Sequence, residues 1–283
     1  MTEKQYYLER NGLIKNELDI TFKELVEHFS SIYSYFNSQE YFSHAVNGTW
    51  EYPYFGEPYQ VFPATFTPSA EIYFINHLQS KKIWPILDHC RKYSKDELFT
   101  VIEILYDHIA IYDQDSKELK KDGPQAEYIE HINNILRLFD GGFYLEPCNG
   151  FVMRMPNQSL KEQLSYKDDE IPDKVYLQLS SASQMYYRFD SDMEMKKKAI
   201  TILGDIYEYE REKIKDLFND EFGINKNKHD KLIFGILNEC NLRHNKENQN
   251  TEYSREIWYD WMMQYYTSAI IAYYRLRSKY EPR

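Results

Sequence analysis

The sequence contains little cysteine, glycine or proline, and each scarcity excludes a class of protein. Its three cysteines are Cys90, Cys148 and Cys240, and no two of them form a C-x-x-C pair. We therefore expect neither a disulfide framework nor a zinc site built on thiolates. Ten glycines and ten prolines among 283 residues are too few for a turn-rich all-β protein or a low-complexity linker. The length suits one large domain or two smaller domains that pack together.

Long hydrophobic runs are also missing from the sequence. No apolar run reaches the roughly 18–20 residues that are needed to cross a bilayer. The most apolar stretch, residues 262–274, is shorter than that and rich in tyrosine. The first residues, Met-Thr-Glu-Lys-Gln-Tyr, lack the apolar core of a signal peptide. We therefore expect a cytoplasmic protein that has no membrane partner.

Negative charge exceeds positive charge, and the excess is distributed unevenly along the chain. The net charge is −11, which disfavours broad, sequence-blind coating of nucleic acid. Residues 222–283 carry ten Lys/Arg and seven Asp/Glu, so this part has a charge of +3 and residues 1–221 have −14. A mildly basic C-terminal part can still provide a phosphate-sized site. The alternative interpretation is that both parts are simply solvated.

Helical periodicity dominates the chain, and capping residues mark the starts of several helices. Thr21 and Ser69 stand at expected helix starts, and Ser94 with Glu97 forms a capping-box pattern. Four prolines interrupt the aromatic-rich residues 50–68, so we expect an extended connector on the surface there. The helices expected in the front part span residues 21–36, 69–93 with an end or kink at Pro85, 94–113 and 123–139.

A short β signal and a charged loop follow these helices. Asn149-Gly150 favours a tight turn, which predicts a β-hairpin near residues 143–155. The charged loop at residues 167–172 suggests a boundary between an N-terminal region, residues 1–166, and a C-terminal domain, residues 173–283. Apolar stripes in the second part specify a helical bundle. Its four expected helices span residues 173–187, 191–218, 228–241 and 254–280. The sequence thus predicts a mainly α protein, in which a helical N-terminal region with a small hairpin packs on a C-terminal helical bundle.

The most reactive group of side chains lies between the last two expected helices. Arg243, His244 and Asn245 are adjacent there, and Lys246 follows them. The guanidinium group of arginine can hold a phosphate with a planar fork of donors. The imidazole of histidine can transfer a proton near neutral pH. The same residues are also ordinary capping groups, because Asn and basic side chains bind the carbonyls at a helix end.

This stretch, with its neighbours, resembles bacterial abortive-infection-type proteins that carry a C-terminal HEPN domain. The resemblance includes the Asn149-Gly150 hairpin, the segment Phe234-Gly-Ile-Leu-Asn-Glu-Cys-Asn-Leu-Arg243-His244-Asn245, and the aromatic helix that ends Ala272-Tyr-Tyr-Arg-Leu276. HEPN domains are four-helix bundles that often dimerise, and many are metal-independent ribonucleases used as toxins or phage-defence effectors. Their signature is an Arg, a following polar residue and a His four to six residues after the Arg. This chain has the Arg and the polar residue, but no His follows His244.

The resemblance implies cleavage of RNA at this turn. Arg243 would stabilise the charge on phosphate, His244 would act as the base or the acid, and Asn245 would orient His244 or contact a base edge. Three further residues, Lys246, Asn248 and Gln249, would bind the RNA. A homodimer through the C-terminal bundle would bring two such turns together, and a protein partner that neutralises a toxin is a further expectation. Because the second His is missing, the alternative is a non-catalytic HEPN-like module that binds nucleotide, RNA or a protein partner.

Other motifs give no support to a cofactor or a metal. His89-Cys90 and Asp107-His108 lie inside expected helices without a second ligand at i+3 or i+4. No G-x-G-x-x-G or Walker-type loop is present. We therefore expect neither cofactor nor metal. The tyrosine-rich helix at residues 254–280 either stacks bases or, as is more usual for aromatic residues at helical spacing, forms core or a dimer interface.

Overall fold

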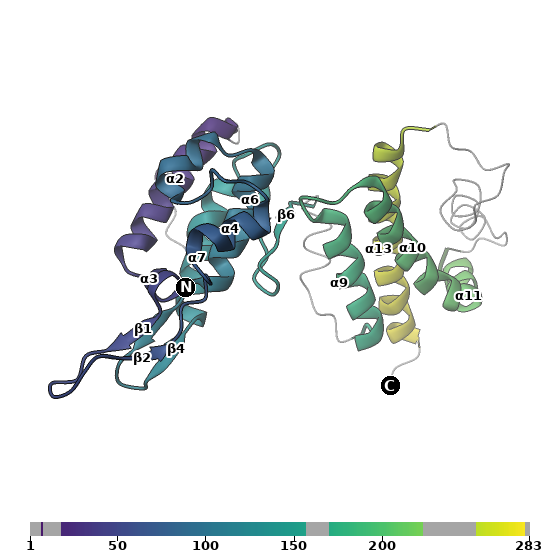
Figure 1. The fold of residues 1–283 in the computed structure, drawn as a ribbon. Helices are drawn as coiled ribbons and strands as arrows, with labels where there is room; N and C mark the ends of the chain where they lie inside the picture. The colour runs from purple at the N-terminus through teal and green to yellow at the C-terminus, as the bar shows by residue number, and fades with distance from the viewer. Residues whose placement is uncertain (1–6, 8–17, 157–169, 223–252, 281–283) are drawn as a thin grey trace. The chain divides into compact units, whose positions relative to one another are not determined.

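The protein is mainly helical and divides into two compact units, residues 1–154 and 155–283 (Figure 1). The computed structural model describes residue 7 and residues 18–156, 170–222 and 253–280. Within these residues the strands form three separate two-stranded antiparallel hairpins. The prediction of a mainly α protein with a small hairpin is therefore confirmed. None of the helices in the described ranges combines the length and the hydrophobicity that a membrane span requires.

The first unit is built from three main helices, several short helices and the three hairpins. The helix start expected at Thr21 and the capping box expected at Ser94 are both confirmed, and Thr21 also forms a capping box, with Glu24. The helices are α2 (Phe22–Ser38), α3 (Ser43–Asn47), α4 (Ala70–Leu78), α5 (Ile86–His89), η1 (Cys90–Lys92), α6 (Lys95–His108) and α7 (Asp122–Leu136). The strands are β1 (Thr49–Glu51), β2 (Tyr59–Phe62), β3 (Ile111–Asp113), β4 (Glu118–Lys120), β5 (Phe143–Leu145) and β6 (Val152–Arg154).

The core of the first unit lies among α2, α6 and α7. Helix α7 packs against both α2 and α6. Phe36 of α2 meets Tyr128 of α7 edge to face, with ring centroids 5.3 Å apart. The hydroxyl group of Tyr128 lies 3.4 Å from the carbonyl oxygen of Ile102, so this fully buried tyrosine keeps a polar partner in α6. Aromatic residues at helical spacing therefore form the core here.

The expected hairpin at residues 143–155 is confirmed, and its turn requires glycine. Strands β5 and β6 pair antiparallel, with Leu145 opposite Val152. Gly150 has a φ of +68°, and a Cβ placed on it would lie 2.4 Å from Cδ1 of Tyr106. The hydroxyl group of Tyr106 donates to the carbonyl oxygen of Pro147 at 2.6 Å, which holds the turn against α6. A side chain at this position would meet both backbone strain and a steric clash.

Two sequence expectations in the first unit are wrong. Residues 50–68 are not only an extended connector, because β1 and β2 pair within them. The helix expected over residues 94–113 ends at His108, since residues 111–113 pair with β4 instead. Both hairpins converge on Glu51, which accepts hydrogen bonds from Tyr59 at 2.5 Å, from Tyr112 and from Lys117. Lys117 and the two tyrosine hydroxyls lower the pKa of Glu51 to about 2.

The helical stretch expected over residues 69–93 is divided into shorter elements. Ser69 caps α4 through its side chain, as expected. Gln79 adopts a left-handed conformation and ends α4 after Leu78, well before Pro85. Pro85 then stands at the N-cap of α5. Proline therefore starts a helix here rather than kinking one.

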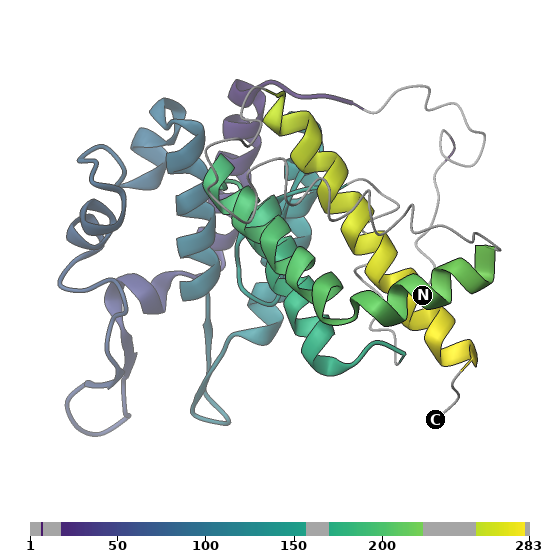
Figure 2. The same ribbon diagram turned by 90° about the vertical axis from the view of Figure 1, so that its right-hand side faces the viewer.

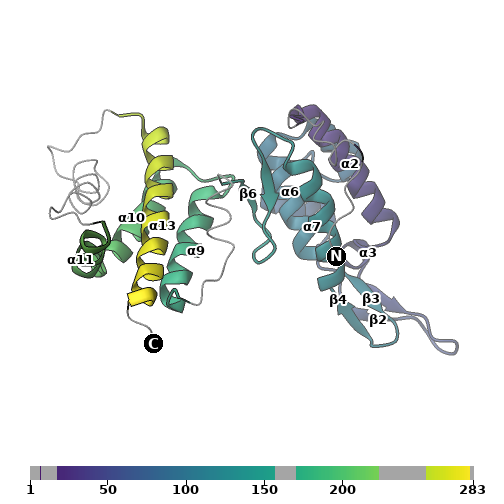
Figure 3. The same ribbon diagram turned by 180° about the vertical axis from the view of Figure 1, so that it is seen from behind.

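The second unit is a bundle whose described helices are α9 (Asp173–Tyr187), α10 (Met193–Tyr209), α11 (Arg211–Phe222) and α13 (Arg255–Tyr280). Helix α10 packs against both α9 and α13, which two opposite views show (Figures 1 and 3). Helix α11 crosses α13 (Figure 2). The fully buried residues at the centre of this bundle come from three helices: Ala182, Ala199, Ile200, Leu203, Met262, Met263, Tyr266 and Ile270.

The described helices of the second unit agree with the predicted ones, except that one predicted helix is divided into two. The expected helices at residues 173–187 and 254–280 are confirmed as α9 and α13. The single helix expected over residues 191–218 is wrong, because the chain turns at Glu210 and forms α10 and α11. Glu210 is buried and binds Tyr273 and Lys213, so a tertiary contact overrides the continuous apolar stripe. The helix expected over residues 228–241 lies outside the described residues.

Candidate functional site

The residues that the sequence selects for RNA cleavage lie outside the described part of the chain. This applies to Arg243, His244, Asn245, Lys246, Asn248 and Gln249, which all fall within residues 223–252. The structure describes the helices that precede and follow this segment. Helix α11 ends at Phe222 and α13 begins at Arg255. In the sequence, the expected catalytic residues therefore lie between α11 and α13.

Two tyrosine–carboxylate hydrogen bonds hold α13 in place. The hydroxyl group of Tyr186 in α9 donates to Oδ1 of Asp260 at 2.5 Å. The hydroxyl group of Tyr273 donates to Oε2 of Glu210 at 3.1 Å. Burial, together with the neighbouring carboxylate in each case, raises the pKa of both tyrosines well above the usual value. Both hydroxyls therefore stay protonated and can donate throughout the physiological pH range.

The first turns of α13 also carry an aromatic surface, which we define as the exposed Trp258 and Trp261 and the half-buried Tyr265. The indole of Trp261 stacks on the ring of Tyr265, with centroids 4.9 Å apart and planes 7° apart. Trp258 meets Trp261 edge to face at 5.6 Å. Trp258 remains 44% exposed and Trp261 37% exposed, so large apolar rings face solvent. Exposed Trp and Tyr side chains are enriched at the centres of protein interfaces.

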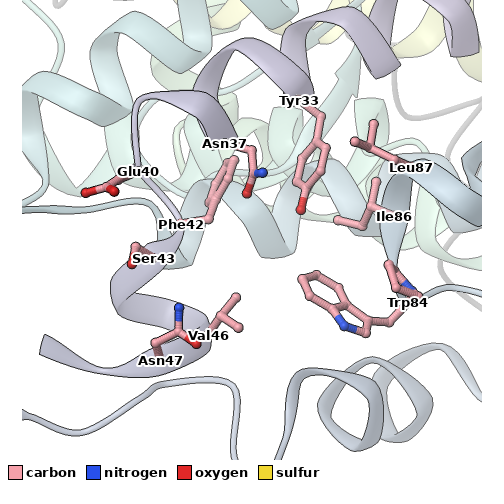
Figure 4. Close-up of a pocket in the computed structure, with 11 residues that line it drawn as sticks. Tyr33, Asn37, Glu40, Phe42, Ser43, Val46, Asn47, Trp84, Ile86 and Leu87 are labelled. Carbon is pink, nitrogen blue, oxygen red and sulfur yellow. The ribbon is translucent and has the colours of Figure 1, made fainter.

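A separate cavity of about 370 Å³ lies within the first unit (Figure 4). Its walls come from three segments of the chain. Tyr33 and Asn37 extend from the end of α2, and Phe42 follows in the turn after that helix. Helix α3 contributes Ser43 and Asn47, and the segment that enters α5 contributes Trp84. Its volume is near the lower end of the range that small-molecule sites occupy.

The aromatic walls of this cavity are supported from behind by other rings. Tyr33 stacks on Phe42, with centroids 5.5 Å apart and planes 16° apart. Trp84 stacks on Phe74, with centroids 5.6 Å apart and planes 15° apart. Burial raises the pKa of Tyr33 to about 12, so its hydroxyl group is neutral and can both donate and accept. The two rings are therefore held before any ligand arrives.

Several polar groups line the cavity without a partner. The hydroxyls of Tyr33 and Ser43, the amides of Asn37 and Asn47 and the indole N–H of Trp84 make no hydrogen bond to another described residue. Figure 4 shows the Tyr33 hydroxyl and the Trp84 ring facing the same open space. Asn37 and Asn47 are exposed, so water can satisfy their amides, and a ligand in the cavity could replace that water. This cavity is the candidate binding site within the described residues.

No family model, curated protein or solved structure gives a significant match to this chain. The candidate sites therefore depend on the chemistry and geometry of their own residues.

The histidines considered as metal ligands have other roles or lie apart. His108 is flanked by Thr65, whose Oγ1 lies 2.8 Å from Nδ1, and by Tyr73, whose hydroxyl group lies 2.7 Å from Nε2. Burial, with the nearby charge of Lys121, lowers the pKa of His108 to about 4. Across the described ranges, no three His, Cys, Asp or Glu side chains are grouped as a metal site. His108 thus serves as a neutral hydrogen-bonding link between α6 and α4.

Sequence reasoning did not find the cavity. It assigned Tyr33 only to the helix expected over residues 21–36, and Trp84 only to the stretch expected over residues 69–93. The local signal was weak, since Asn37, Ser43 and Asn47 resemble ordinary helix-end and turn residues. More than forty positions separate Tyr33 from Trp84 in the sequence, and only the fold brings the two rings to one cavity.

Proposed function

We propose that the protein is an anti-phage, abortive-infection-type effector that cleaves RNA without a metal. The observation that carries the proposal is the adjacent Arg243-His244-Asn245 in the connection that enters α13. The packing of α13 on α10 in a helical bundle supports this proposal. The HEPN-like interpretation expects the cleavage site between the last two helices of such a bundle. Lys246, Asn248 and Gln249 would bind the RNA next to this turn.

The proposed cleavage uses the RNA's own 2′-hydroxyl as the nucleophile. A base removes the 2′-OH proton, the 2′-oxygen attacks phosphorus, and the bond from phosphorus to the 5′-oxygen breaks. An acid then protonates the leaving 5′-oxygen, which yields a 2′,3′-cyclic phosphate and a 5′-hydroxyl. Arg243 stabilises the additional negative charge on the phosphate oxygens through paired hydrogen bonds. Histidine can exchange a proton near neutral pH, so His244 would serve as base or acid.

A homodimer would supply the second imidazole that one chain lacks. The aromatic surface of α13 favours such self-association, because Trp258 and Trp261 expose large apolar rings. Sedimentation of Trp258→Ala/Trp261→Ala should show a shift from dimer to monomer. Tyr209→Ala is the matched control, because Tyr209 is an exposed aromatic residue on α10, and it should leave the dimer intact. A monomeric wild-type protein would contradict the dimer.

The test of function is inducible expression of wild type beside Arg243→Ala and His244→Ala. We expect wild type to arrest growth and to produce RNA fragments that end in 2′,3′-cyclic phosphate, and both variants to lose these effects. Arg255→Ala is the control, because Arg255 is an exposed arginine at the start of α13 outside the turn. Cleavage that persists in His244→Ala would remove the proposed mechanism.

The missing second histidine favours one alternative, a non-catalytic HEPN-like module that binds nucleotide, RNA or a protein partner. No histidine follows His244 in the sequence. In this case wild type and Arg243→Ala would both leave growth and cellular RNA intact. Purified wild type would still retain a labelled RNA in a filter-binding assay, and Arg243→Ala would retain less. A neutralising protein partner is expected only for the toxic effector, and it would restore growth when co-expressed.

A further inference from the structure

The cavity of the first unit has the features of a site for a small planar molecule. It combines two supported aromatic rings with five hydrogen-bonding side chains that have no partner among the described residues. From this combination we propose that the cavity binds a neutral nucleobase, with adenine preferred, either free or as a nucleoside. This binding role is separate from RNA cleavage and does not depend on it.

Ring geometry supports a flat heteroaromatic ligand. Phe74 covers one face of the Trp84 indole, and the cavity adjoins the Trp84 side chain. Tyr33 is held in the same way by Phe42, and its hydroxyl group faces the cavity (Figure 4). Aromatic side chains bind bases by stacking, and any base can stack because every base has a π-face. Rings that are already supported lose little freedom when a ligand stacks on them.

Two asparagine side chains account for the preference for adenine. Asn37 and Asn47 approach the cavity from α2 and α3, so an amide can meet the edge of a bound ring from more than one wall. An asparagine amide offers one acceptor and two donors. This pattern pairs with N6 and N7 of adenine through two hydrogen bonds. The hydroxyls of Tyr33 and Ser43 can bind the remaining polar atoms of the base or sugar.

The charge of the cavity excludes a phosphate as the main point of recognition. Among the described residues, Glu40 is the only charged one that lines the cavity, and no lysine or arginine does. The carboxylate of Glu40 lies toward the margin of the cavity (Figure 4), where it would repel a phosphate group. A neutral base or nucleoside is therefore favoured over a nucleotide.

The experiment is isothermal titration of the full-length chain with adenosine, uridine and AMP. We expect saturable binding of adenosine, weaker binding of uridine and no gain in affinity for AMP. Asn37→Ala and Tyr33→Phe should each weaken adenosine binding about 3- to 10-fold, because each removes a hydrogen bond to the ligand. Asn76→Ala is the matched control, since Asn76 is an exposed asparagine near the end of α4 that does not line the cavity.

Thermal unfolding of the same proteins separates lost binding from lost folding. Tyr33→Phe keeps the buried ring and Asn37→Ala changes an exposed position, so both variants should melt close to wild type. Added adenosine should raise the melting temperature of wild type and of Asn76→Ala, and raise that of Asn37→Ala less. The proposal is overturned if adenosine does not bind wild type, if both cavity variants bind it as wild type does, or if AMP binds more tightly than adenosine.

Discussion

Replacing Thr267 with valine should stabilise the second unit. Thr267 is fully buried in α13, and its Oγ1 has no hydrogen-bond partner among the described residues. A buried hydroxyl without a partner costs about 1–3 kcal/mol of desolvation. Valine has nearly the same shape and similar helix propensity, and it replaces the hydroxyl group with a methyl group. Thr267→Val should therefore gain about 1 kcal/mol of unfolding free energy.

Differential scanning calorimetry can measure this gain as an increase in melting temperature. For a protein of this size, about 1 kcal/mol corresponds to roughly 2–4 °C. Thr201→Val is the matched control, because Thr201 lies on α10 and its hydroxyl group donates to the carbonyl oxygen of Lys197 at 2.9 Å. That substitution removes a satisfied hydrogen bond and should lower the melting temperature. A Thr267→Val protein that melts at or below wild type would refute the reasoning.

Two further predictions concern the first unit. Gly150→Ala should destabilise the protein by about 1–3 kcal/mol, measured by thermal unfolding, because the new Cβ would enter the ring of Tyr106 at a positive φ. Lowering the pH from about 6.5 toward 4 should also destabilise the fold, because burial lowers the pKa of His108 to about 4 while the unfolded chain binds the proton near 6.5. Urea unfolding at several pH values should show this loss, and His108→Gln should reduce it.

Both predictions have matched controls in the same unit. Gly123→Ala should be neutral or slightly stabilising, because no atom lies within 4 Å of the added Cβ and Gly123 is in helix α7. A Gly150→Ala protein as stable as Gly123→Ala would contradict the clash with Tyr106. His28→Gln should leave the acid sensitivity unchanged, because His28 is exposed on α2. An unchanged pH dependence in His108→Gln would show that another group causes the loss.

Elements that depend only on residues close together in the sequence could be predicted from local sequence patterns. The helix cap at Thr21 and the hairpin that contains Asn149-Gly150 are both determined within a few residues, and both were predicted correctly. The helix break at Glu210 could not be read in this way, because it depends on a hydrogen bond from Tyr273, 63 positions away. Hairpins β1–β2 and β3–β4 were missed, and the link between them is not local, because Glu51 of β1 binds Tyr112 and Lys117 more than sixty positions away.

The two candidate sites differ in what the sequence could reveal. Arg243 and His244 are adjacent, so their chemistry can be read directly from the chain, although their positions lie outside the described residues. The cavity near Trp84 consists of residues that are ordinary in their local context. Only packing brings the Asn37 amide and the Trp84 indole to one space. A constellation assembled from distant segments therefore needs the fold before it can be recognised.

The two tyrosine–carboxylate bonds determine how α13 can move. Asp260 and Tyr273 are 13 positions apart, which is about 20 Å along the helix axis, and each is bonded to a different part of the bundle. A rotation of α13 about its axis would break both bonds at once, whereas a rigid tilt could preserve one as a pivot. The rotation of α13 about its own axis is therefore fixed by polar contacts at two separate levels, in addition to the apolar packing of the bundle.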